Sequence, residues 1–142
     1  FKTYYTDHCK EATAPYPGIM ELLKTLQEHE IPMAIVSNKN DAAVKRLAAD
    51  FFEGIISVAI GERTGVRKKP APDTVFTALE ELGEHADSAV YVGDSEVDLQ
   101  TAANSGMDCI SVAWGFKGRA FLEKEGASHI VDTPEEILRF LI

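Results

Sequence analysis

The sequence predicts an α/β fold in which a parallel sheet is covered by helices on both faces. Short apolar segments alternate with amphipathic segments of helical period along most of the chain. Several of the short segments are apolar at every position, as strands buried between two helical layers are. Such alternation gives parallel strands joined by right-handed crossovers. Glycine, proline or a helix-capping residue separates many neighbouring segments, which supports the division into elements.

The first part of the chain begins with an aromatic, amphipathic segment that Pro15, Pro17 and Gly18 bring to an end. Further on, Asn40 or Asp41 is suited to cap a helix. We expect helices over residues 1–12, 19–30 and 41–50, and strands over residues 31–37 and 55–60.

In the second part, a glycine-bearing, cation-rich loop over residues 61–69 leads into a helix that begins near Pro70 and Pro72 and ends at Gly83. The remaining segments continue the alternation. We expect strands over residues 89–93, 108–113 and 129–131, and helices over residues 96–105, 118–125 and 134–142.

Composition narrows the class of partner. The chain has 142 residues, of which 45% are hydrophobic, and its formal net charge is −9. No basic stripe is available to neutralise phosphates of nucleic acid, so nucleic acid is not an expected partner, whereas a small phosphorylated metabolite needs only a few placed cations. No apolar run reaches membrane-spanning length, and Cys9 and Cys109 lack metal-ligand spacing. We expect a cytoplasmic monomer or homodimer with Cys109 as a buried free thiol.

The most informative stretch is the turn after the strand at 89–93, where Asp94 and Asp98 stand four residues apart. Ligands of open α/β sheets bind at the carboxyl ends of strands, and paired carboxylates there are typical Mg²⁺ ligands. A different reading stays open, in which Asp94 or Ser95 caps the helix and Asp98 is an ordinary solvated residue.

Two further strand-to-helix junctions carry polar groups at the same sheet edge. Ser37, Asn38 and Lys39 offer a hydroxyl and backbone N–H groups, which suit an anion, although a plain helix cap explains them as well. Lys69 precedes Pro70 and Pro72, and this pair of prolines restricts the backbone that carries the lysine. A hydroxyl, a fixed cation and a metal-binding carboxylate together form the apparatus of phosphoryl transfer.

The ordered set of Ser37-Asn38, Lys69-Pro70-x-Pro72 and Gly93-Asp94-Ser95-x-x-Asp98 resembles motifs II, III and IV of the haloacid dehalogenase-like hydrolases, and within them the phosphoglycolate phosphatase branch. The resemblance covers residues 15–142 and implies a Rossmann-like α/β core. It implies that Ser37 and the Asn38 amide bind the transferring phosphoryl group and that Lys69 balances its charge. Asp94 would ligate Mg²⁺. Asp98 would be either a second Mg²⁺ ligand or a residue that supports the ligands without contacting the metal.

The sequence departs from the family pattern at motif I, because it contains no Asp-x-Asp and therefore no counterpart of the nucleophilic aspartate and the general acid/base. In relatives that strand is central in the sheet and a helical cap domain follows it. We therefore interpret residues 1–14 as the last helix of a cap and residues 15–142 as an incomplete core, with a gap between the strands at 31–37 and 89–93.

The resemblance implies a Mg²⁺-dependent phosphatase that hydrolyses a small, phosphoglycolate-like phosphomonoester through an aspartyl-phosphate in the full-length parent. The chain alone is expected to be inactive, because it lacks the nucleophile. In the full-length parent, Ser37, Lys69 and Asp94 would be catalytic residues. A phosphomutase of the same superfamily and a non-catalytic phosphate-binding α/β module remain alternatives.

Overall fold

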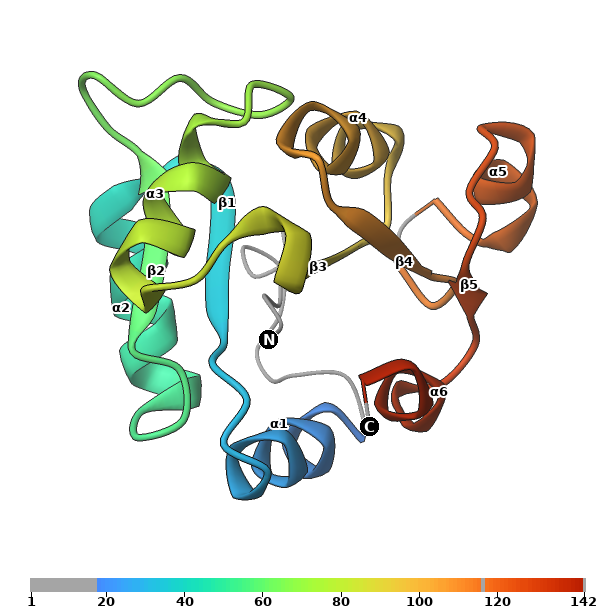
Figure 1. Cartoon of the computed structure of the whole chain (residues 1–142), viewed down its shortest axis with the longest axis horizontal. Coiled ribbons are helices and arrows are strands. Elements are labelled where there is room, and N and C mark those ends of the chain that lie inside the picture. Colours follow the sequence, from blue (N-terminus) through green and yellow to red (C-terminus); the bar gives the residue numbers. More distant parts are fainter. Residues whose placement is uncertain (1–17, 116, 142) are drawn as a thin grey trace.

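Helices and strands alternate through residues 18–115 and 117–141, which are the residues that the computed structural model describes (Figure 1). The helix expected over residues 1–12, and with it the domain boundary at residue 14, lies outside the described residues. The elements in chain order are α1 (Ile19–Glu28), β1 (Ala34–Asn40), α2 (Asp41–Phe52), β2 (Val58–Glu62), α3 (Asp73–Leu82), the 3₁₀ turn η1 (Ala86–Ser88), β3 (Val90–Gly93), α4 (Glu96–Ser105), β4 (Asp108–Val112), α5 (Arg119–Lys124), β5 (Ile130–Val131) and α6 (Pro134–Leu141).

All strand pairs within the described sheets are parallel, as predicted, but the strands form two sheets instead of one. β1 pairs with β2, and β3 pairs with β4, which pairs with β5. Among the described residues β1 and β3 share no ladder, and Figure 1 shows them as the inner strands of the two sheets. The break therefore falls between β1 and β3, where the sequence predicts a gap.

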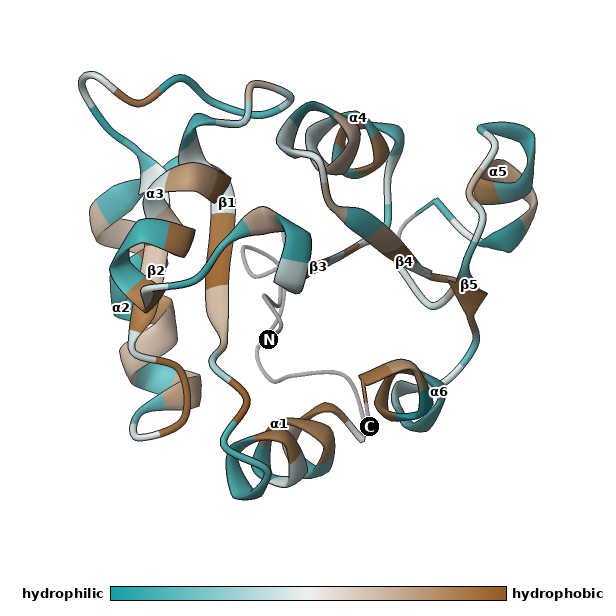
Figure 2. Cartoon of the chain, viewed as in Figure 1, coloured by the Kyte–Doolittle hydropathy of each residue, from teal (hydrophilic) through white to brown (hydrophobic). Residues whose placement is uncertain are grey.

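Side chains join the two sheets even though backbone pairing does not. One core cluster combines Ile35 of β1 and Val92 of β3 with apolar residues of α1, α2 and α6. The other combines Val36 of β1 and Tyr91 of β3 with residues of α3 and α4. Helices thus cover both faces of the strands, and the hydropathy colouring in Figure 2 shows apolar strands between helices that carry polar residues on their surfaces. The predicted α/β architecture is confirmed.

The bounds of β1 differ from the expected ones in a way that matters for the site. The ladder with β2 begins at Ala34 because Pro32 has no N–H to donate, and it resumes at Asn40 after an irregularity. The Asn40 side chain then accepts hydrogen bonds from the N–H groups of Ala42 and Ala43 and caps α2. The expectation that residues 38 and 39 stand at a helix start is therefore wrong: they lie in the bulged end of the strand.

The described helices are short. The longest, α2, has 12 residues, and no helix in the described ranges combines the length and apolar character that crossing a membrane requires.

Cys109 in β4 is a free thiol, as expected, but it is half-buried rather than fully buried. Burial is the main cause that raises its pKa to about 12, and the negative charge of Asp98 adds to the shift. The shift disfavours the thiolate, which is the reactive form of cysteine, at neutral pH.

Candidate functional site

Ser37, the first predicted site residue, lies in the irregular last part of β1. The register with β2 runs evenly from Ala34 to Val36 and shifts before Asn40. Ser37 is 1% exposed, and its Oγ accepts a hydrogen bond from Lys39 N–H at 3.2 Å. Because a hydroxyl both donates and accepts, its proton remains available for an acceptor oxygen such as that of a phosphate group.

Lys69 is a buried cation near the end of the loop that joins β2 to α3. It is 3% exposed, and its Nζ donates a hydrogen bond to Asp98 Oδ1 at 3.1 Å. Burial lowers the pKa of the amine from 10.5 to about 8, although the charges of Asp98 and Asp94 favour the protonated form. At neutral pH Lys69 is therefore a desolvated cation beside two carboxylates.

The backbone around Lys69 is held by amide side chains from two distant elements. Asn38 Oδ1 accepts from Lys69 N–H at 2.7 Å, and Asn38 Nδ2 donates to the Lys69 carbonyl at 3.3 Å. Asn104 of α4 donates to the carbonyl of Pro70 at 2.8 Å, and the peptide bond between Lys69 and Pro70 is cis. The loop is thus tied to the end of β1 and to α4.

Asp98 organises the junction between β3 and α4. Its Oδ1 accepts from Lys69 Nζ and from the Tyr91 hydroxyl at 2.8 Å. Its Oδ2 accepts from Asp94 N–H at 2.9 Å, Ser95 N–H at 3.2 Å and the Ser95 hydroxyl at 3.0 Å. Ser95 Oγ in turn accepts from Asp98 N–H, which completes a capping box. Asp98 is 0% exposed, so the reading of this residue as solvated is wrong, and both its oxygens are engaged by protein donors.

Asp94 follows β3 directly and is 4% exposed. Two glycines make room for the carboxylates: a Cβ on Gly115 would collide with the Asp94 side chain, and a Cβ on Gly93 would collide with that of Asp98. Asp94 lies near enough to Lys69 for its charge to raise the lysine pKa. The carboxylate therefore stands at the carboxyl end of β3 within the field of the buried cation.

A chain of hydrogen bonds links the three predicted junctions. It runs from Asn38, the neighbour of Ser37, to Lys69, then to Asp98 and finally to the backbone of Asp94. Ser37 and Asp94 are buried at the carboxyl ends of β1 and β3, and Lys69 is buried in the loop between β2 and α3. The structure thus brings the predicted residues to one place, while their chemical roles stay predictions.

Sequence reasoning missed three contributors to this cluster. Tyr91 reads as an ordinary apolar strand residue, Asn104 as a surface residue of α4, and Gly115 as a loop glycine. Their contacts depend on which elements pack together, and a single sequence does not reveal this. Trp114, which follows the end of β4, is half-buried and packs against the core cluster around α1 and α6.

The described residues fit Mg²⁺ only as a partial donor set. Mg²⁺ prefers carboxylate oxygens and commonly binds one or two of them together with waters and phosphate oxygens. Asp94 offers such a carboxylate, whereas the Asp98 oxygens already accept five hydrogen bonds. In the part of the chain that the structure describes, no group of three or more His, Cys, Asp or Glu residues could hold a metal. Asp94 is therefore the candidate ligand, and further ligands would come from outside this set.

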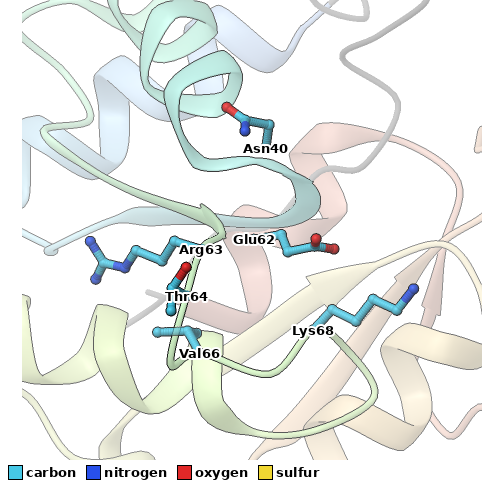
Figure 3. Close-up of a pocket in the computed structure, with 6 residues that line it drawn as sticks. All are labelled: Asn40, Glu62, Arg63, Thr64, Val66 and Lys68. Carbon is cyan, nitrogen blue, oxygen red and sulfur yellow. The ribbon is translucent and has the colours of Figure 1, made fainter.

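An open pocket of about 560 Å³ is lined by residues other than those of this cluster (Figure 3). Its walls come from the end of β1, the end of β2 and the loop that follows, and none of them is a predicted site residue. The lining residues are Asn40, Glu62, Arg63, Thr64, Val66 and Lys68. Lys68 is exposed, in contrast to its buried neighbour Lys69. Although Lys68 and Lys69 are adjacent in sequence, only Lys69 is buried in the cluster, while Lys68 lines the pocket.

Lys69 should make the stability of the fold depend on pH. Its pKa is about 8 in the folded chain and 10.5 ordinarily, so between these values the unfolded chain binds a proton that the folded chain has lost. The free energy of unfolding therefore rises with pH in this window. Against Lys69→Met, which lacks the titration, the wild type should gain roughly 2 kcal/mol between about pH 7.5 and 10 in urea unfolding. Parallel pH profiles for the two proteins would contradict this.

Fold and site together define a class. The chain is an α/β protein with parallel strands, in which a serine hydroxyl and an aspartate at the carboxyl ends of β1 and β3 lie in one buried cluster with a lysine from the loop between β2 and α3.

Comparison with known proteins gives the family. The model of the haloacid dehalogenase-like hydrolases matches residues 1–112, and the chain belongs to this family. A phosphoglycolate phosphatase of Pseudomonas savastanoi pv. phaseolicola is 32% identical over 133 residues, which are 90% of this chain and 47% of that protein. One from Aquifex aeolicus is 31% identical over 117 residues, which are 82% of this chain and 55% of that protein. The chain thus spans about half the length of these relatives.

A solved structure supports the same assignment. The crystal structure of a protein from Lactobacillus delbrueckii subsp. bulgaricus, provisionally named phosphoglycolate phosphatase, has a TM-score of 0.89 and 44% sequence identity. The match covers 93% of this chain and 56% of that one. The family resemblance seen in the motifs is confirmed.

Proposed function

We propose that this chain forms the phosphate-binding and metal-binding part of a Mg²⁺-dependent phosphatase that hydrolyses small phosphomonoesters. The observation that carries the proposal is the buried Lys69 amine, which lies beside Asp98 and Asp94 and whose backbone is bonded to Asn38, the neighbour of Ser37. A cation held in a desolvated position stabilises the charge of a transferring phosphoryl group far more than a solvated one does. Membership of the hydrolase family supports this reading.

Each residue then has a separate task. The Ser37 hydroxyl and the Asn38 N–H donate to the oxygens of the phosphoryl group, and Lys69 neutralises its charge. Asp94 holds Mg²⁺, which when bound supplies Lewis-acid charge neutralisation at the phosphate oxygens. Asp98, with both oxygens occupied, holds Lys69 and the Asp94 backbone in place.

The nucleophile must come from outside this sequence, which contains no Asp-x-Asp. We propose that an aspartate-bearing strand fits between β1 and β3, the inner strands of the two separate sheets. Its carboxylate oxygen would bond to phosphorus as the ester oxygen leaves with a proton from the acid/base residue. Water would then hydrolyse the aspartyl-phosphate and release inorganic phosphate. Without that strand, the chain should bind a phosphomonoester but should not hydrolyse it.

The proposed substrate class is a small phosphomonoester related to phosphoglycolate. The support is the name of the sequence relatives, which are phosphoglycolate phosphatases. A cytoplasmic location and a monomeric or homodimeric state remain proposals from composition.

The experiment compares the chain alone with the chain joined behind an Asp-x-Asp-Gly-Thr strand, using p-nitrophenyl phosphate with Mg²⁺ or with EDTA. We expect turnover only from the completed protein and only with Mg²⁺. Appreciable Mg²⁺-dependent turnover by the chain alone would contradict the assignment of the nucleophile. A completed, folded protein without turnover would instead favour a non-catalytic phosphate-binding module.

A further inference from the structure

We propose that the side chain of Asn38 is a positioning residue that sets the place of Lys69 relative to Ser37. This rests on the proposed function for its catalytic consequence, but the positioning itself can be tested without turnover. The family resemblance assigns Asn38 only a backbone amide, so the side chain has a separate task.

Asn38 holds the backbone of Lys69 by two hydrogen bonds, an arrangement that we call the Asn38 bracket. The Asn38 carboxamide accepts from Lys69 N–H at 2.7 Å and donates to the carbonyl of the same residue at 3.3 Å. Two bonds from one planar group to both backbone atoms of one residue fix its orientation as well as its distance. Asn38 and Lys69 are 31 residues apart in sequence, so nothing local holds them together.

The opposite end of the lysine is also held. Nζ donates to Asp98 at 3.1 Å, and both side chains in that ion pair are 1% exposed. A lysine amine stands on a flexible four-carbon stem, so the ion pair alone leaves the backbone free to shift. With Asn38 as the second anchor, both ends of Lys69 are fixed. Because Asn38 is bonded covalently to Ser37, the bracket fixes the amine with respect to the serine hydroxyl.

This arrangement distinguishes Asn38 from the other tether of the loop. Asn104 donates to the carbonyl of Pro70 at 2.8 Å, and it is exposed, whereas Asn38 is half-buried. Asn104 therefore stabilises the loop without bonding Lys69, and Asn104→Ala is the matched control for Asn38→Ala.

The first test is amide hydrogen exchange of the chain, measured by NMR at Lys69. In Asn38→Ala, exchange at the Lys69 N–H should accelerate at least about tenfold, because its acceptor is gone. Asn38→Asp keeps an acceptor oxygen and should retain slow exchange, and Asn104→Ala should leave the Lys69 rate within about twofold. Slow exchange at Lys69 in a folded Asn38→Ala variant would overturn the bracket.

The second test uses the strand-completed protein with p-nitrophenyl phosphate. Misplacing a catalytic group by about 1 Å can cost about 100-fold in rate, so Asn38→Ala should lower kcat about 10- to 100-fold with a smaller change in KM. Asn104→Ala, which frees the loop at Pro70 but leaves both Lys69 hydrogen bonds to Asn38 in place, should lower kcat at least about fivefold less than Asn38→Ala does. Equal losses in the two variants would reduce Asn38 to a loop tether and overturn the proposal. If the wild-type protein shows no turnover, the proposed function fails, and the exchange measurement still decides whether Asn38 places Lys69.

Discussion

Replacing Asp98 with alanine is expected to destabilise the fold by about 3–5 kcal/mol, because it removes the carboxylate that forms a buried ion pair with Lys69. The substitution also removes the acceptor of four further hydrogen bonds, from Tyr91, Asp94 and the backbone and hydroxyl of Ser95. The capping box of α4 is lost with them. Urea unfolding followed by circular dichroism measures the loss, and a variant that does not fold at all agrees with the expected direction.

Asp50→Ala serves as the matched control for this prediction. Asp50 is an exposed residue of α2, and its removal should change the unfolding free energy by no more than about 0.5 kcal/mol. A second variant, Asp98→Asn, keeps the shape but not the charge and should fall between the two. If Asp98→Ala were as stable as Asp50→Ala, the buried network would not hold the junction together.

Replacing Lys69 with methionine should lower kcat/KM for a phosphomonoester by about 10²- to 10³-fold in the strand-completed protein. Methionine keeps most of the volume of the lysine side chain and removes its positive charge. Its loss takes away the desolvated cation beside the phosphoryl site, where a single charge-stabilising donor is worth about 10²–10³ in rate. The measurement is steady-state hydrolysis of p-nitrophenyl phosphate with Mg²⁺. Asp98 keeps four of its donors, so the variant should still fold.

The neighbouring lysine provides a control that differs by one position. Lys68 is exposed, and Lys68→Met should keep kcat/KM within about threefold, because a solvated surface charge contributes little. Similar losses in the two variants would show that net charge near the loop matters and that the buried amine has no special place.

The α/β alternation and most element positions followed from the sequence because they depend on local hydrophobic period. The helix over Glu96–Ser105 matches its predicted bounds, since Ser95 and Gly106 mark its ends chemically. β1 was displaced by three residues because its ladder depends on the partner strand: Val58 pairs with Ala34, and the bulge before Asn40 lets the strand continue past Ser37. No single-strand pattern contains that information.

In the candidate site, too, the sequence predicts which residues take part but not which contacts they make. Ser37, Lys69, Asp94 and Asp98 could be named from motifs, but the use of each atom could not. Asp98 was expected as a metal ligand or a supporting partner, and its five accepted hydrogen bonds favour the supporting role. The Asn38 bracket arises from a contact across 31 residues, which packing determines and residue type does not.

The most direct test is a crystal structure of the strand-completed protein with Mn²⁺ in place of Mg²⁺ and tungstate in place of phosphate, both located by anomalous scattering. We predict Mn²⁺ on the Asp94 carboxylate and tungstate within hydrogen-bonding distance of both Ser37 Oγ and Lys69 Nζ. Mn²⁺ and tungstate bound to separate surfaces, or tungstate in the pocket beside Lys68 with the buried cluster empty, would contradict the account.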